Sequence, residues 1–401
     1  MKQRNAFMLG VVWILVTVSV IASTLTLMAN GGFSRGMRFR NNAEIVQRYA
    51  RLEDVRRILT EGYYQDMDEE ALIEGAIRGM MNALKDPYTF YYSPEEMSKH
   101  AQETGAAYCG MGMLVQNNSD GFIEVIRVYA NGPAAAAGIV GGDLILSIND
   151  NPVNGTDAQN LNEAVDRLGA CSGEKVRVVV RRGEETLCFD ITPGEVAVDN
   201  IAFSMVGDHI GYISIFQFSG NAVEGFRQAL GSLAQRGAKG LIVDVRNNPG
   251  GLLDDVVEIA DELLGEGRIV YTEDRQGSRQ EYDSDAAHCD LPMAILVNRM
   301  SASASEILAA ALQEHGRALV IGEQTYGKGI VQTLVTFEED GAGMQYTSAC
   351  YYTPSGRSIQ GTGVTPDLLV RAQAGFNSYS GIPDPENDLQ LQAALVQLQG
   401  A

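Results

Sequence analysis

Residues 297–307 read Val297-Asn298-Arg299-Met300-Ser301-Ala302-Ser303-Ala304-Ser305-Glu306-Ile307. The pattern predicts a buried strand over Met293–Val297 that turns into a helix over Ser303–His315. A serine at such a turn projects from the edge of a sheet beside the free N–H groups of the helix start, and the N–H of Ala304 is placed to stabilise an oxyanion. Helix capping explains the same stretch, because serine is a favoured N-cap residue. On this stretch alone, capping is the stronger interpretation.

Strand and helix patterns alternate around this turn, which predicts an α/β core after Pro193. Asp244-Val245-Arg246-Asn247-Asn248-Pro249-Gly250-Gly251 is a buried strand that opens into a glycine turn and could supply a second oxyanion donor, although glycine pairs are common in ordinary turns. The other expected strands are His209–Phe216, Leu241–Val245, Ala318–Ile321, Ile330–Phe337 and Met344–Tyr352, and the other expected helices are Leu252–Leu264 and Asp388–Leu398.

Residues 322–332 read Gly322-Glu323-Gln324-Thr325-Tyr326-Gly327-Lys328-Gly329-Ile330-Val331-Gln332 and imitate a phosphate-binding loop. That interpretation fails, because Gly329 offers no hydroxyl to a magnesium ion and a β-branched strand pattern follows instead of a helix. A lysine between glycines and two apolar strands can be desolvated, which lowers its pKa and leaves a free amine to act as a base. Gln332 lies four residues after Lys328 in an extended segment, so we expect both side chains on one face.

The chain has four histidines, His100, His209, His288 and His315, and none lies in a glycine-rich turn beside an orienting carboxylate. A serine–histidine–aspartate triad is therefore less favoured than a lysine base. No histidine or carboxylate cluster has the spacing of metal ligands, so we expect no metal and no cofactor.

A run of small residues between 132 and 149 indicates a peptide-binding module. Gly132-Pro133-Ala134-Ala135-Ala136-Ala137-Gly138-Ile139 leads into Gly141-Gly142-Asp143-Leu144, which resembles the signature of a PDZ domain. Upstream, Gly110, Met111 and Gly112 resemble the PDZ loop whose backbone N–H groups hold the terminal carboxylate of a peptide. Short strands over Gly121–Val128 and Lys175–Arg181 and a helix over Asn160–Leu168 complete this module.

The N-terminal part begins with Lys2 and Arg4 and continues with 22 residues, Phe7–Met28, that carry no charge. This length suffices to cross a bilayer, and the positive charges before it predict a cytoplasmic N-terminus with the rest of the chain outside. Helical spacing of apolar residues predicts two helices over Glu44–Leu59 and Asp68–Leu84. The stretch Asp86-Pro87-Tyr88-Thr89-Phe90-Tyr91-Tyr92 then favours an aromatic packing patch.

The composition of the 401 residues sets further limits. A net charge of −21 argues against nucleic acid as a partner. The five cysteines, Cys109, Cys171, Cys188, Cys289 and Cys350, are scattered and favour buried small side chains, with a single bridge such as Cys171 to Cys188 left open.

Taken in order, the stretches at 86–89, 244–251, 301–306 and 325–332, the PDZ run, and Tyr352-Thr353-Pro354-Ser355-Gly356-Arg357-Ser358-Ile359-Gln360-Gly361 resemble the carboxyl-terminal processing peptidases, or tail-specific proteases. The resemblance implies an α+β and α/β fold: a crotonase-like (ClpP/crotonase-type) core with an inserted PDZ domain, an N-terminal helical region and an N-terminal transmembrane helix. The implied domains are an anchor at 1–30, the helical region at 31–104, the PDZ domain at 105–192, the serine peptidase core at 193–371 and a C-terminal helical segment at 372–401.

The same resemblance assigns the roles in the site. It makes Ser303 the nucleophile, Lys328 the base and Gln332 the orienting residue, with the N–H groups of Gly251 and Ala304 as the oxyanion hole. It also selects Ser303 from its neighbours, which the residues alone do not. It implies a membrane-anchored, extracytoplasmic endopeptidase that acts on proteins with free C-termini and forms a homodimer.

Three rival functions are open to test. A pseudoenzyme scaffold is disfavoured by the intact Ser303, Lys328 and Gln332. A histidine-triad protease with a PDZ module requires a Gly-Asn-Ser-Gly-Gly nucleophile stretch, which is missing from the sequence. An acyl-CoA enzyme on the same core fold needs neither the PDZ unit nor an external location.

Overall fold

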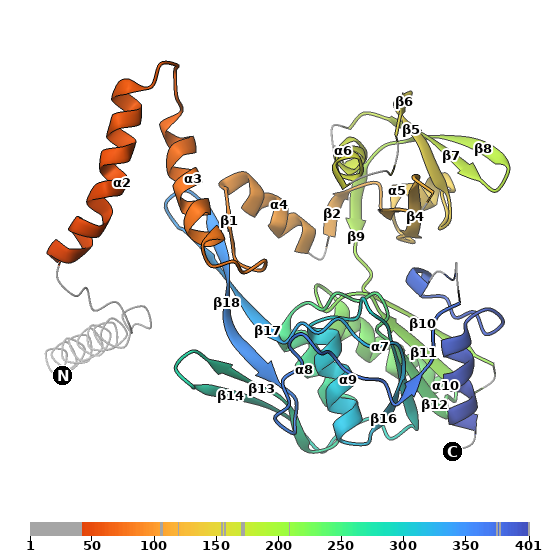
Figure 1. The fold of residues 1–401 in the computed structure, drawn as a ribbon. Coiled ribbons are helices and arrows are strands. Elements are labelled where there is room, and N and C mark those ends of the chain that lie inside the picture. Colours follow the sequence, from red (N-terminus) through yellow and green to blue (C-terminus); the bar gives the residue numbers. More distant parts are fainter. Residues whose placement is uncertain are drawn as a thin grey trace, which may run out of the picture. The chain divides into compact units, whose positions relative to one another are not determined.

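The computed structural model describes residues 42–104, 107–118, 120–153, 155, 158–169, 173–207, 209–373, 376 and 378–399 (Figure 1). The predicted anchor at 1–30 lies outside these ranges. None of the helices within them combines the length and the apolar character needed to cross a membrane. The chain divides into two compact units, one up to Ala76 and one from Ile77 onward.

The first unit contains helix α2, Asn42–Gly62, and the first half of helix α3, Glu69–Asn82, which confirms the two predicted helices. Arg56 of α2 forms ion pairs with Glu53 and with Glu69 at the start of α3. The apolar residues that predicted α2 are exposed in this chain: Tyr49, Leu52, Val55 and Ile58. These apolar side chains are therefore left uncovered by the described residues of the same unit.

The second unit contains a PDZ-like module. Its main sheet has the strand order β3-β4-β5-β7-β8, with β6 paired to β5. Apolar side chains of these strands and of the module's helices α5 and α6 form one buried cluster, which includes Ile123, Ile145 and Val178. The elements are β2 (Ala107–Gly110), β3 (Met113–Asn117), β4 (Ile123–Val128), α5 (Pro133–Ala137), β5 (Leu144–Ile148), β6 (Asn151–Pro152), α6 (Ala158–Gly169), β7 (Val176–Arg182), β8 (Glu185–Ile191) and β9 (Gly194–Ala197), which pairs with β2.

A six-stranded sheet forms the centre of the core, with the order β10-β11-β12-β15-β16-β19. The strands from β11 to β19 are parallel, and β10 is antiparallel to β11. Alternating residues of the strands bury on opposite faces, because side chains along a strand point to the two sides in turn. Ile213, Val243 and Ile295 pack against helices α7, α8 and α9. The strands are β10 (Ile201–Val206), β11 (Ile210–Ile215), β12 (Gly240–Asp244), β15 (Met293–Val297), β16 (Ala318–Gly322) and β19 (Leu368–Leu369), and the helices are α7 (Ala222–Gln235), α8 (Leu253–Asp261) and α9 (Ala304–Glu314).

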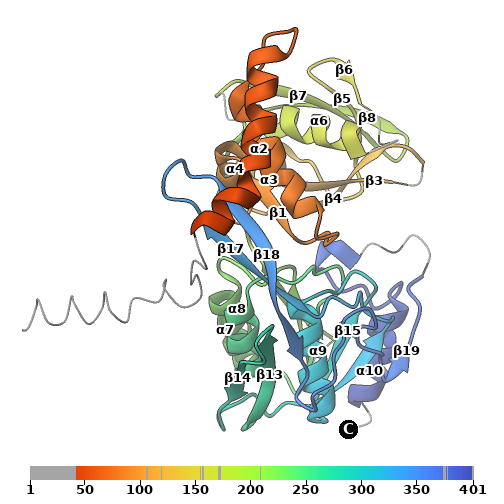
Figure 2. The same ribbon diagram turned by 60° about the vertical axis from the view of Figure 1, so that its left-hand side comes forward.

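Helix α10, Leu389–Gln399, covers the opposite face of this sheet (Figure 2). Its Leu391 and Ala394 pack on Ile242 and Leu296. The buried guanidinium of Arg246, just after β12, pairs with Asp388 at the start of α10, with an Nη2–Oδ2 distance of 2.7 Å. The C-terminal helix is thereby fixed to the end of the strand that leads into the glycine turn at 250–251.

A second, antiparallel sheet carries the order β1-β18-β13-β14, with β17 paired to β18. Strand β18 is long: its first residues pair with β1 and its last residues pair with β13. Figure 1 shows β17 and β18 running together from the core toward β1. The strands are β1 (Phe90–Tyr92), β13 (Gly267–Asp274), β14 (Arg279–Ser284), β17 (Ile330–Thr336) and β18 (Gly343–Tyr352); helix α4 spans Pro94–Thr104 and a short 3-10 helix, η1, spans Ser378–Ser380.

The strands and helices predicted from the sequence agree with the structure to within a few residues at each end. Helix α7 has no counterpart in the prediction, because Gly225 and Gly231 interrupt its otherwise regular apolar spacing. The sequence left one disulfide bridge open, and the structure has one at a different cysteine from the Cys188 considered. Cys109 is disulfide-bonded, and Cys188 is free and exposed, which removes the bridge considered between Cys188 and Cys171, a residue outside the described ranges.

Candidate active site

Two strand-to-helix turns meet at the carboxyl ends of β12 and β15. The N–H of Asn247 donates to Oδ1 of Asn298 at 3.0 Å, and Nδ2 of Asn298 donates back to Oδ1 of Asn247 at 2.7 Å. The buried Asn248 accepts the N–H of Ala302 at its carbonyl and holds the N–H of Gly250 with its side chain, at 3.0 and 2.8 Å. Because β12 and β15 are adjacent parallel strands, both turns lie at one edge of the sheet.

The structure distinguishes the three serines of the 301–305 stretch. The Ser301 hydroxyl donates to the carbonyl of Val245 at 2.8 Å, and the Ser305 hydroxyl donates to the carbonyl of Asn248 at 2.9 Å. Both side chains are buried and help to join the two turns. Ser303 is half-buried and lines a pocket of about 470 Å³. Ser303 is also the N-cap residue of α9. The same residue therefore begins the helix and lines the pocket.

Ser303 has an unusual backbone conformation, with φ 54° and ψ −116°. A positive φ costs free energy for a residue with a Cβ, and such strain is typical of functional turns. The surrounding hydrogen bonds must therefore stabilise this backbone conformation, which sets the position of the Ser303 hydroxyl.

Gly251 and Ala304 line the same pocket as Ser303. Neither N–H group donates a hydrogen bond to an acceptor in the described part of the chain. Gly250 lies against the Ser303 turn, since a Cβ added there would stand 2.8 Å from Cβ of Ser303 and 3.0 Å from the nitrogen of Ala304. At Gly251, with φ 144°, an added Cβ would meet the carbonyl oxygen of Phe218 at 2.1 Å. Glycine is thus required at both positions, and two N–H donors remain available next to Ser303.

A buried carboxylate, Glu306, connects the serine turn to the lysine loop. Its Oε2 accepts the backbone N–H groups of Ser303 and Lys328, each at 2.9 Å. Its Oε1 accepts the hydroxyl of Thr325 at 2.5 Å and the N–H of Gly327 at 2.7 Å. In all four hydrogen bonds Glu306 is the acceptor, as a carboxylate without a proton of its own must be. Glu306 therefore fixes the backbones of Ser303 and Lys328 relative to one another.

The lysine loop is held from its other side by the 353–361 stretch. The N–H of Gly329 donates to Oε1 of Gln360 at 2.7 Å, and the N–H of Gly361 donates to the carbonyl of Gly327 at 2.8 Å. A Cβ at Gly329 would meet the nitrogen of Gln360 at 2.7 Å, so only glycine permits this approach. Strand β17 follows the loop, which agrees with the rejection of a phosphate-binding loop. The buried hydroxyl of Tyr351 lies within hydrogen-bond distance of the carbonyls of Ser303 and Lys328.

Lys328 is half-buried, and burial lowers the pKa of its ammonium group, while the charges of Asp86 and Glu306 act to raise it. Its Nζ lies 4.8 Å from the centre of the Tyr88 ring. Gln332 lines the Ser303 pocket, whereas Lys328 is not among the residues that line it. A β-bulge between Val331 and Gln332 interrupts the regular alternation on which the same-face prediction rested.

The Ser303 pocket is lined mainly by apolar side chains, and one histidine also reaches it. His100, from α4, lines the pocket and stacks on Tyr92 with ring centres 5.0 Å apart. His315 forms the C-cap of α9, at the far end of the helix that Ser303 begins. The apolar lining comes from Phe218, Leu252, Leu253, Ala304, Ile307, Ile330, Val331 and Leu334.

The predicted peptide-binding loop, Gly110, Met111 and Gly112, connects β2 to β3 in the PDZ-like module. The Met111 side chain is buried and its carbonyl accepts the N–H of Ala134 at 2.8 Å, so the loop packs on helix α5. Gly112 has φ 78°, and a Cβ there would meet Cα of Gly132 at 2.8 Å. These glycines permit the close contact between the loop and the start of α5.

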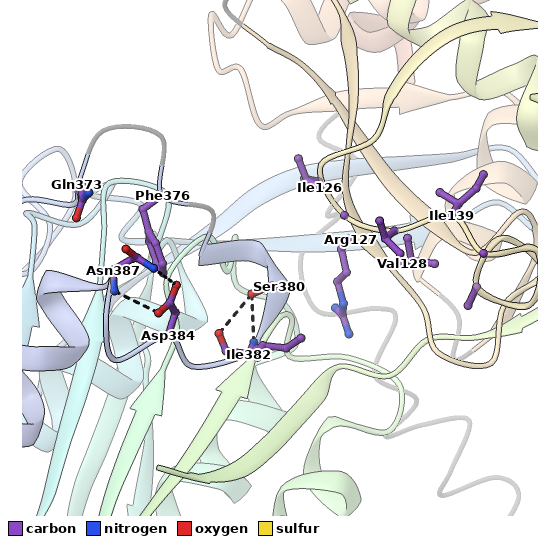
Figure 3. A pocket seen from close by; sticks show the side chains of 14 residues that line it. Ile126, Arg127, Val128, Ile139, Gln373, Phe376, Ser380, Ile382, Asp384 and Asn387 are labelled. Atoms are coloured by element: carbon purple, nitrogen blue, oxygen red, sulfur yellow. Dashed lines mark hydrogen bonds between the residues drawn. The ribbon is translucent and has the colours of Figure 1, made fainter. Parts of the chain in front are cut away.

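A larger pocket, of about 940 Å³, lies between the β4–α5 part of the PDZ-like module and the segment before α10 (Figure 3). Arg127 reaches from β4 and stacks its guanidinium on the ring of Phe216, 3.3 Å from the ring centre. It also donates a hydrogen bond to the carbonyl of Asp199. None of the predicted site residues lines this pocket.

Sequence reasoning gave Glu306 and Tyr351 no role in the site, and assigned Asp86 and Tyr88 to packing. The spacing Ser303-x-x-Glu306 is a capping-box signal that points to Glu306, although its second set of partners comes from a distant loop.

Comparison with known proteins places these observations in a family. Residues 209–370 match peptidase family S41, residues 124–182 match a PDZ domain, and residues 24–96 match the N-terminal domain of the activating protease CtpB. A carboxy-terminal-processing protease of Bartonella bacilliformis is 33% identical over 90% of this chain and 90% of its own length. The chain belongs to the carboxy-terminal processing proteases of peptidase family S41.

Other carboxy-terminal processing proteases show the same extent of similarity. The protease of Picosynechococcus is 38% identical over 80% of this chain and 77% of its own length. The solved structure of a photosystem II D1 C-terminal processing protease is 31% identical, covers 80% of this chain and 86% of its own, and has a TM-score of 0.53. The chain is accordingly a serine-type carboxyl-terminal processing endopeptidase with a PDZ domain and a mixed α/β fold.

Proposed function

We propose that Ser303 is the nucleophile of this peptidase, that Lys328 is its general base and that Gln332 orients the amine. The observation that carries the proposal is the shared carboxylate: Glu306 binds the backbone N–H groups of Ser303 and Lys328 with the same oxygen. The serine and lysine loops are thereby built as one unit. Gln332, Gly251 and Ala304 line the pocket that contains Ser303.

The proposed reaction begins with a neutral Lys328 amine. Nζ takes the proton of Ser303 as Oγ bonds to the scissile carbonyl carbon, and the N–H groups of Gly251 and Ala304 stabilise the oxyanion. The C–N bond breaks while the Lys328 ammonium returns the proton to the leaving amine, which yields an acyl-enzyme. A water molecule then attacks the ester carbon and gives its proton to Lys328. The ester C–O bond breaks as Lys328 returns this proton to Oγ, and Ser303 leaves as the alcohol.

Burial supports this assignment, because it lowers the pKa of Lys328 and so raises the fraction of neutral amine at a given pH. The test is cleavage of a peptide with an apolar C-terminal tail by Ser303→Ala and Lys328→Ala proteins that remain folded. We expect neither variant to cleave. Wild-type turnover by Lys328→Ala would reject the lysine as base.

The proposal extends to substrate, location and assembly. We propose that the loop Gly110–Gly112 holds the free C-terminus of a protein substrate, that the core is crotonase-like, and that residues 1–30 anchor the enzyme with its catalytic part outside the cytoplasm. We also propose a homodimer, which the exposed apolar residues Leu52, Val55 and Ile58 of α2 support. A size measurement by light scattering on wild type and on Leu52→Glu tests the dimer.

A further inference from the structure

The turn at Asp86–Tyr88 contacts the core site although it lies far away in the sequence. Oδ2 of Asp86 accepts the hydroxyl of Thr89 and the hydroxyl of Thr347 in β18, each at 2.6 Å. Oδ1 of Asp86 accepts the N–H of Tyr88 at 3.0 Å. The N–H of Thr347 in turn donates to the hydroxyl of Thr89 at 3.1 Å. The turn is therefore fixed to β18, at the residue that pairs with Gln332.

Tyr88 presents the face of its ring to the Lys328 side chain. The distance of 4.8 Å from Nζ to the ring centre is within the range of a cation–π contact. That contact favours the ammonium over the neutral amine, because the attraction acts on the positive charge. The interaction with Tyr326 in the lysine loop raises the pKa of the Tyr88 phenol.

Two carboxylates near Lys328 also favour its charged form. The two carboxylates that influence it are Asp86 and Glu306, and the neighbouring phenols are Tyr88 and Tyr326. Burial raises the pKa of the Asp86 carboxyl, but the bonds from Thr347, Thr89 and the Tyr88 N–H and the charge of Lys328 outweigh it and hold that pKa below its usual value. Asp86 is thus a permanent negative charge that opposes the effect of burial on Lys328.

Resting on the proposed function, we infer that the Asp86–Tyr88 turn binds the charged form of the Lys328 side chain, so that Lys328 must lose its proton and leave the Tyr88 ring before it takes the proton of Ser303. Asp86 and Tyr88 are positioning residues in this arrangement, since they act through Lys328. Through these contacts, the turn before β1 directly affects the protonation of Lys328, the proposed base.

The inference is tested by the reactivity of Lys328 itself. The protein is acetylated briefly with acetic anhydride across a pH series, and mass spectrometry measures the extent of acetylation at Lys328. This extent reports the fraction of neutral amine, and the exposed Lys175 serves as the internal reference. We expect Tyr88→Leu and Asp86→Asn to increase Lys328 acetylation at pH 7 about three- to tenfold, as a fall of about half to one pKa unit requires. The acid limb of kcat/KM should move to lower pH by the same amount.

Matched variants distinguish the effects of the Tyr88 ring and the Asp86 charge on Lys328 from the effect of changing a side chain elsewhere. Tyr88→Phe keeps the ring face, so the pH dependence of Lys328 acetylation should stay at the wild-type position. Glu339→Gln removes an exposed carboxylate from the β17–β18 connection and should leave that pH dependence unchanged. Asp86→Asn provides the second variant if Tyr88→Leu does not fold.

Unchanged or slower acetylation of Lys328 in both Tyr88→Leu and Asp86→Asn would overturn the inference. A failure of the proposed function is seen separately, as cleavage by Lys328→Ala, and the acetylation series still decides whether the turn binds the ammonium. A loss of cleavage in Tyr88→Leu with wild-type acetylation of Lys328 would also contradict it, because the turn would then support the fold and not hold the charge.

Discussion

The backbone N–H groups of Ser303 and Lys328 donate to one and the same oxygen, Oε2 of Glu306, each at 2.9 Å. The two residues belong to different loops, one at the start of α9 and one before β17. A change in either loop is therefore transmitted to the other through a single buried carboxylate.

Replacement of this carboxylate should damage both the site and the fold. Glu306→Gln places an amide NH2 group against N–H donors, and the lost charge-assisted hydrogen bonds should lower the free energy of unfolding by about 2–3 kcal/mol. We expect kcat to fall at least tenfold, and thermal denaturation with peptide cleavage measures both effects. Glu339→Gln, at an exposed position, is the control. A Glu306→Gln protein with wild-type kcat and stability would show that the carboxylate is dispensable.

The glycine of the proposed oxyanion hole can be tested against a glycine of helix α7. Gly251→Ala introduces a Cβ 2.1 Å from the carbonyl oxygen of Phe218 and should displace the N–H donor. We expect a fall in kcat of about a hundredfold, as for loss of one oxyanion donor. Gly231→Ala meets nothing within 4 Å and should stabilise the protein by about 0.5–1 kcal/mol with unchanged kcat. Equal kcat values for the two variants would argue against Gly251 as a donor.

The pH dependence of cleavage should report Lys328 and not His100. Because burial lowers the pKa of Lys328, kcat/KM should rise with pH through a value below the ordinary 10.5. Lys328→Arg keeps a charge that is not lost in this range and should be inactive at every pH. His100→Gln should leave the position of the acid limb unchanged, although His100 lines the pocket. An acid limb that disappears in His100→Gln would favour a histidine base.

Recognition of the substrate terminus gives a prediction for the PDZ-like module. If the loop Gly110–Gly112 holds a carboxylate, amidation of the C-terminus of a peptide substrate should raise KM and slow cleavage severalfold. Gly112→Ala should weaken this discrimination, because its φ of 78° and the contact with Gly132 require glycine. Equal cleavage of free and amidated peptides by the wild-type protein would show that the loop does not recognise the terminal carboxylate.

The sequence predicted those parts of the site that depend on local patterns. The strand, turn and helix around Ser303 follow from apolar periodicity and small residues, and the structure has them at 293–297 and 304–314. The second role of Glu306 was not predictable, because its partner Lys328 lies 22 residues away in another loop. A capping box specifies contacts within one turn of helix only.

Two further features depended on tertiary contacts. Asp86 and Tyr88 gave only an aromatic packing signal, because the partner of Asp86 in β18 is 261 residues distant. The same-face argument for Lys328 and Gln332 assumed an uninterrupted strand, whereas Lys328 precedes β17 and a bulge follows Val331. Bulges are set by the pairing of a particular strand with its neighbour, which spacing along one segment does not contain.

The most direct measurement for the central claim is the site and rate of acylation by a serine-directed active-site probe. Peptide mapping of the wild-type protein should find a single adduct on Ser303, formed faster as the pH rises, and Lys328→Ala should form it at least a hundredfold more slowly. An adduct on another residue, or wild-type labelling of Ser303 in Lys328→Ala, would contradict the activation of Ser303 by Lys328.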